Sequence, residues 1–75
     1  MDTRAKIKSI IAAENTTLKN IIEEYNARHA DHPTTAQNMT NKLARRTIRF
    51  DEVAEIADIL GYDIVFINRE TKKEY

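Results

Sequence analysis

The sequence predicts a single, mainly α-helical domain of four short helices followed by one β-strand. Three observations support this fold class. Apolar residues recur at helical spacing in four segments. The one proline and the one glycine stand between segments, where breaks belong. After Gly61 the pattern changes to a β-branched and aromatic run, which favours a strand. A chain of 75 residues has room for one domain, with a helical bundle over residues 1–61 and a strand and tail over residues 62–75.

The first two helices are separated by a short polar break. Asp2 or Thr3 can cap the first helix, and Thr16 or Thr17 can cap the second. The second helix can end at Asn26, although the pattern allows it to continue as far as His29. Apolar residues at helical spacing predict the inward faces of both helices, which comprise Ile7, Ile10 and Ile11 in the first and Leu18, Ile21, Ile22 and Tyr25 in the second.

A proline-containing break precedes the third helix. Pro33 lacks a backbone donor and disfavours helical geometry in the residue before it. The third helix is predicted over residues 36–45. Its N-cap is either Thr34, through a capping box with Gln37, or Thr35 as a simple N-cap. Its inward face consists of Met39 and Leu43.

The fourth helix follows a short basic connector. We expect Asp51 to be its N-cap, and Gly61 to end it in the left-handed conformation that glycine adopts easily. The residues predicted to face inward are Val53, Ile56, Ala57 and Leu60.

Residues 62–67 are predicted to form a strand whose centre is apolar on both faces. Such a strand expects cover on both sides, and no second strong strand is evident. The possibility that we favour is pairing with the same strand of a second copy across a two-fold axis. The other possibility is a hairpin within one chain, turning at residues 68–71 and docked on the first and fourth helices. The expected dimer interface consists of Tyr62, Ile64, Val65, Phe66 and Ile67.

The charge distribution is asymmetric although the formal net charge is zero. Residues 1–50 contain nine Lys/Arg and five Asp/Glu, whereas residues 51–75 contain three and seven. Residues 42–49 contain four cations and no acid. Such a cluster is typical of a surface that binds a polyanion, although an ordinary solvated helix face has similar charges.

The third helix carries side chains suited to the major groove of DNA. Gln37 and Asn41 lie four residues apart on one face, and an amide can bond N6 and N7 of adenine together. Ala36 and Thr40 flank them and are small enough to admit a thymine methyl group. The cations placed to reach phosphates are Lys42, Arg45, Arg46 and Arg49.

Three stretches, "TLKNIIEEY", "NMTNKLAR" and "EIADILGYDI", resemble the lambda-repressor/Cro type of helix-turn-helix, the xenobiotic-response-element family. The likeness is to its small forms in Gram-positive bacteria, phages and mobile elements, and covers about residues 3–68. It implies DNA binding by the third helix and dimers on palindromic operators. It also implies a phosphate contact from Thr35, base contacts from Ala36, Gln37 and Asn41, and flanking contacts from Thr40 and Lys42. Two features depart from the family, namely a long glycine-free connection over residues 27–34 and a strand in place of the fifth helix.

The sequence therefore predicts a cytoplasmic transcriptional regulator that binds a double-stranded DNA operator, acting as a homodimeric repressor. The alternative is a protein-binding module on the same scaffold, such as an antitoxin, a phage inhibitor or a partner of another regulator, which the neutral charge and acidic C-terminal third favour. No enzyme activity, metal, cofactor, small-molecule substrate or membrane association is expected. No catalytic triad spacing and no glycine-rich phosphate loop occurs, and His29 and His32 beside Asp31 lack the further ligands of a structural zinc site.

Overall fold

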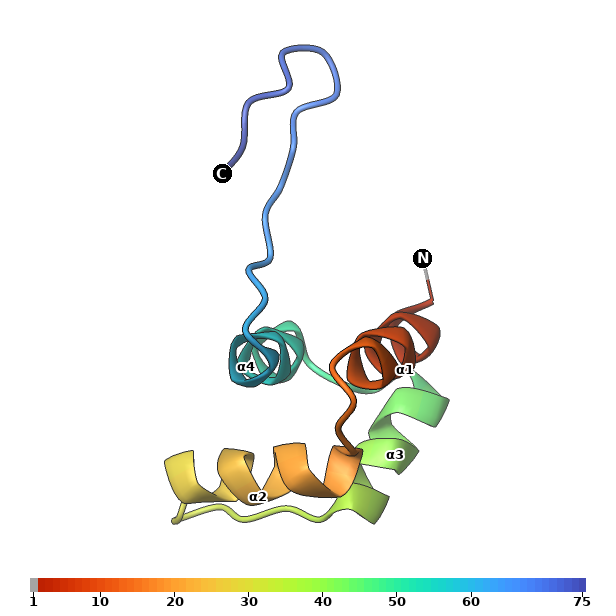
Figure 1. The fold of residues 1–75 in the computed structure, drawn as a ribbon, viewed down its shortest axis with the longest axis vertical. Helices are drawn as coiled ribbons and strands as arrows, with labels where there is room; N and C mark the ends of the chain where they lie inside the picture. Colours follow the sequence, from red (N-terminus) through yellow and green to blue (C-terminus); the bar gives the residue numbers. More distant parts are fainter. Residues whose placement is uncertain (1) are drawn as a thin grey trace.

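The computed structural model describes residues 2–75 and contains a small all-α domain of four helices. The helices are α1 (Thr3–Ala13), α2 (Leu18–Arg28), α3 (Ala36–Arg45) and α4 (Phe50–Leu60). In Figure 1, α1 and α4 are viewed nearly along their axes, α2 runs across below α4, and α3 lies beside α1. The predicted order of four helices is confirmed. In this part of the chain, no helix is long and apolar enough to cross a lipid bilayer.

The first three helices begin at caps that were among the predicted alternatives. Asp2 Oδ1 accepts a hydrogen bond from the backbone N–H two residues further along, at 3.0 Å. The hydroxyl groups of Thr17 and Thr35 each accept from the N–H three residues further along, at 3.2 and 3.0 Å. Each cap satisfies a backbone donor that the first helical turn leaves without a partner.

The prediction that Asp51 caps the fourth helix is wrong. The N-cap of α4 is Arg49, and the helix begins at Phe50. The reason is Glu52, whose Oε1 accepts from the backbone N–H of Arg49 at 3.0 Å and so fixes the chain entering the helix. Asp51 lies inside the first turn, where its negative charge is favourable near the helix N-terminus.

A small apolar core joins the four helices. All of its buried residues were predicted to face inward, and Met39 and Ile56 have no exposed surface. The buried residues are Ile7, Ile21, Ile22, Met39, Leu43, Ile56 and Ala57. Because the core is this small, polar contacts at its edges carry a larger share of the stability than in a larger domain.

The long connection between α2 and α3 is fastened to α2. Helix α2 extends to Arg28, so the connection comprises residues 29–35, and it runs back alongside α2 in Figure 1. The side chain of Asn26 holds it there by two hydrogen bonds. Asn26 Nδ2 donates to the carbonyl of Thr34 at 2.8 Å, and the N–H of Thr34 donates to Asn26 Oδ1 at 2.8 Å. The departure from the usual short connection is therefore taken up by a longer helix and an anchored loop.

Residues 62–67 do not form a β-strand in this chain, so that prediction is wrong for the isolated molecule. Within residues 2–75 the only β-type pairing is an isolated antiparallel bridge between Ile67 and Glu74. The chain leaves α4 extended, projects beyond the bundle and then turns back (Figure 1). A strand needs a ladder of hydrogen bonds with a neighbour, and the returning tail supplies a single bridge. We call residues 62–75 the C-terminal arm.

The return of the C-terminal arm resembles the hairpin that the sequence left as an alternative. Asn68 Oδ1 accepts from two backbone N–H groups of the turn, at 2.9 and 3.1 Å. Phe66 and Tyr75 then exchange two backbone hydrogen bonds, at 3.0 and 2.9 Å. The ring of Phe66 stacks on that of Phe50 with centroids 6.1 Å apart, which brings the arm against α4. Pairing between two copies stays a prediction.

Candidate nucleic-acid interface

The exposed face of α3 holds the two predicted amide side chains. Gln37 and Asn41 are exposed, whereas Met39 and Leu43 are buried on the other side of the helix. Gln37 Nε2 donates to Asn41 Oδ1 at 3.1 Å. This bond links the two side chains and leaves Gln37 Oε1 as a free acceptor and the Asn41 amide as a free donor. An acceptor beside a donor matches N6–H and N7 on the major-groove edge of adenine.

The remaining predicted contacts of this helix surround the amide pair. Ala36 and Thr40 are half-buried, so each presents only part of its small side chain. Thr35 is exposed, and its hydroxyl oxygen accepts the capping bond from the backbone N–H of Asn38 at 3.0 Å. That bond leaves the hydroxyl hydrogen of Thr35 available for a phosphate oxygen. The contacts of these residues with DNA stay predictions.

Three of the four predicted phosphate-binding cations are free of acidic partners. Arg45, Arg46 and Arg49 are exposed and form no ion pair with any residue in the range 2–75. Arg46 has φ of 59°, in the left-handed region, where it ends α3. Residues that have a Cβ atom are disfavoured in this conformation, whereas glycine adopts it easily. The presence of Arg46 there therefore has a conformational cost, which a contact made by the guanidinium group would explain.

Lys42 has a different environment from the three arginines. Its Nζ lies 2.6 Å from Oε2 of Glu52, whose side chain is only 11% exposed. Burial raises the pKa of Glu52, but the hydrogen bonds from Lys42 and from the Arg49 backbone outweigh it, so the pKa lies below its ordinary value. The pair ties the end of α3 to the start of α4. The role of Glu52 was missed from the sequence, although its position three residues after Arg49 is the spacing of a capping box.

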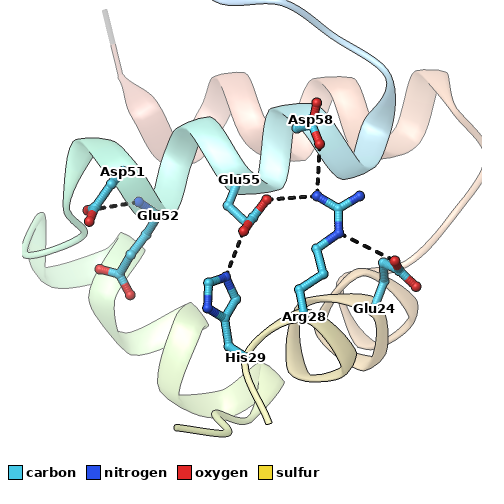
Figure 2. Close-up of polar contacts among 7 residues, drawn as sticks. All are labelled: Glu24, Arg28, His29, Asp51, Glu52, Glu55 and Asp58. Atoms are coloured by element: carbon cyan, nitrogen blue, oxygen red, sulfur yellow. Dashed lines mark hydrogen bonds and ion pairs between the residues drawn. The ribbon is translucent and has the colours of Figure 1, made fainter. Parts of the chain in front are cut away.

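A second group of charged residues joins the end of α2 to α4 (Figure 2). Arg28 Nη1 lies 2.7 Å from Glu55 Oε2 and 2.8 Å from Asp58 Oδ2. Its Nε lies 3.4 Å from Oε1 of Glu24, and His29 Nε2 lies 2.6 Å from Glu55 Oε1. The hydrogen bonds from His29 and Arg28 hold the pKa of Glu55 below its ordinary value. We call these five residues the α2–α4 charge cluster; sequence analysis missed it, because its members lie on different elements.

The charges are thus separated over the molecule. From α3 to Arg49 the chain has four cations and no acid, whereas α4 has four acids and no cation. The α2–α4 charge cluster directs Arg28 toward the acids of α4. In the segment from α3 to Arg49, the cations without an acidic partner therefore lie around the exposed face of α3.

The residues predicted for a dimer interface lie along the C-terminal arm. Ile64, Val65, Phe66 and Ile67 are exposed, and Tyr62 is exposed with its hydroxyl donating to Glu14 at 2.8 Å. That bond raises the pKa of Tyr62. The base of the arm forms one wall of an apolar groove of about 700 Å³ between α1 and α4. The structure brings these side chains together on one projecting element.

Comparison with known protein families, with characterised proteins and with solved structures finds no match to this chain.

Proposed function

We propose that this protein is a sequence-specific, double-stranded DNA-binding transcriptional regulator, with α3 as its recognition helix in the major groove. The observation that carries the proposal is the exposed Gln37–Asn41 pair, which lies on a helix whose end and following connector hold three unpaired arginines. A recognition helix needs base-contacting groups toward its N-terminal end and cations that reach the backbone. The likeness to the lambda-repressor/Cro type of helix-turn-helix supports the same assignment.

The linked amides favour half-sites that contain adenine. With its Nε2 engaged, Gln37 offers Oε1 to the N6 amino group, while Asn41 offers its amide hydrogen to N7. Guanine has acceptors at both positions, so it would face the Gln37 oxygen with a second acceptor. The half-buried Thr40 beside the pair suits the methyl group of the paired thymine.

The regulator acts as a homodimer in this proposal, with the exposed apolar residues of the C-terminal arm in the interface. Two recognition helices would then enter successive major grooves on one side of a palindromic operator. A dimer bound there would repress transcription by excluding polymerase from the same DNA. The exposed edge of the arm supports this arrangement, because an extended apolar segment readily pairs with a copy of itself.

The test is selection from random duplexes with the purified protein, combined with sedimentation. We expect enrichment of a palindrome with A·T pairs in each half-site, and a mass in solution twice that of the 8.7 kDa chain. Failure to enrich any sequence, together with no retention of random duplex at 50 mM salt, would refute the DNA-binding assignment. A monomeric mass with normal enrichment would refute only the dimer.

A second candidate is a protein-binding module on the same scaffold. The observation that favours it is the apolar C-terminal arm beside the acid-rich α4, which offers a surface to another protein. Chromatography on heparin separates the two candidates. Retention at low salt that is lost as salt rises supports DNA binding, and passage without retention supports the protein partner.

A further inference from the structure

Helix α1 faces α3 with a positively charged surface that the proposed recognition helix does not account for. The segment Thr3–Ala13 contains three cations and no acid. Two of them, Arg4 and Lys8, lie four residues apart and therefore on one face of the helix. Both are exposed, and neither forms an ion pair with another residue of the described chain.

Two adjoining hollows place these cations beside α3. Arg4 and Lys8 line an apolar hollow of about 370 Å³ whose other wall includes Thr40, a predicted base contact. Arg4 and Arg46 line the neighbouring polar hollow of about 410 Å³. Arg4 and Leu43 line both hollows, so the two lie next to each other between α1 and α3. The acid in the second hollow is Asp2, whose Oδ1 is engaged in capping α1.

We propose that Arg4 and Lys8 bind the DNA backbone on the α1 side of the recognition helix, so that the interface spans α1 as well as α3. This inference rests on the proposed function. Arg45, Arg46 and Arg49 follow the recognition face toward its C-terminal end. Arg4 and Lys8 lie across the hollow from Thr40, and Arg4 also shares the neighbouring hollow with Arg46. A helix inserted in the major groove has a phosphate backbone on each side. The cations of α1 therefore extend the positively charged surface from Arg46 along α1, where they meet the backbone on that side of the helix.

The test measures how binding to a random 20-base-pair duplex depends on salt. Each lost phosphate contact reduces the slope of log affinity against log salt by about 0.9. We expect the double variant Arg4→Gln/Lys8→Gln to lower the slope by about 1.8 per protomer. When salt rises from 50 to 200 mM, the affinity of both proteins falls. The factor by which it falls is then roughly tenfold smaller per protomer for the double variant than for the unmodified protein. Circular dichroism checks that the double variant retains its helices.

The matched control is Lys6→Gln/Lys72→Gln, which removes the same charge. Lys6 is also on α1 but lines the groove beside the C-terminal arm, and Lys72 closes the turn of that arm by donating its N–H to the carbonyl of Asn68. This turn lies far from α3 in Figure 1. The control is expected to keep the slope of the unmodified protein. An equal loss of slope in both double variants would overturn the proposal, because the effect would then come from net charge alone.

Two further experiments separate the remaining explanations. The charge-retaining variant Arg4→Lys/Lys8→Arg is expected to restore the slope, and failure to restore it would overturn the phosphate role. Polyglutamate that carries the same charge as the duplex is not expected to bind the protein. If the protein binds polyglutamate but not the duplex, the surface serves an acidic polypeptide and the DNA assignment is overturned. If the unmodified protein binds no duplex, the proposed function falls as well. If it binds duplex but Arg4→Gln/Lys8→Gln changes nothing, only this inference falls.

Discussion

Replacing Asn26 tests whether the anchored connection holds the recognition helix in place. This half-buried side chain makes two hydrogen bonds of 2.8 Å with the backbone of Thr34, one as donor and one as acceptor. Each such bond contributes about 1 kcal/mol, so Asn26→Ala is expected to lower the free energy of unfolding by about 2 kcal/mol. In a domain of this size that corresponds to a fall in melting temperature of roughly 8–16 °C.

Asn26→Asp is the matched variant for this prediction. Its carboxylate can still accept from the N–H of Thr34 but cannot donate to the carbonyl, so one of the two bonds is lost. We expect it to fall between the unmodified protein and Asn26→Ala in urea unfolding followed by circular dichroism. If Asn26→Ala unfolds within 0.3 kcal/mol of the unmodified protein, roughly the noise of such comparisons, the connection is not held by this side chain and the reasoning is refuted.

Three other predictions concern the surface charges. Arg45→Ala is expected to weaken binding to all duplexes alike and to reduce the salt slope by about 0.9, measured by fluorescence anisotropy; an unchanged slope would remove it from the phosphate contacts. Arg46→Gly is expected to raise stability by about 1 kcal/mol in urea unfolding, because glycine tolerates φ of 59°, while it weakens duplex binding; lower stability would show that the left-handed residue is not strained. Because the pKa of Glu55 is lowered in the folded protein, its contribution is present above the unfolded pKa of about 4.3 and is lost as pH falls through the folded value. The stability difference between the unmodified protein and Glu55→Gln should therefore shrink below about pH 4.3, and a difference that grows there would contradict the assignment.

The helices and the core could be predicted because their signals are local. Met39 and Leu43 four residues apart, or Thr35 before a helical segment, express the helical period and the capping requirement directly. The predicted start of α4 was wrong, since neighbouring acids at positions 51 and 52 both suit a helix N-terminus. Only the geometry shows that Glu52 reaches back to the preceding backbone.

The other differences involve partners distant in the chain. A run such as residues 62–67 has strand propensity, but a strand forms only where a neighbour supplies hydrogen bonds, and the short tail supplies one bridge. Arg28 meets Glu55 and Asp58 across 27 and 30 residues, a pairing for which the sequence gives no periodic signal. Lys42 likewise pairs with Glu52, so a cation that the local sequence assigns to DNA is partly neutralised by its neighbour.

The most direct test of the proposed recognition helix compares Asn41→Ala with the unmodified protein on two duplexes, the selected operator and a scrambled one of equal length. We expect operator affinity to fall about 5- to 150-fold, which corresponds to roughly 1–3 kcal/mol, while affinity for the scrambled duplex is unchanged. An equal loss on both duplexes, or no loss on either, would show that the exposed amide pair of α3 does not contact bases.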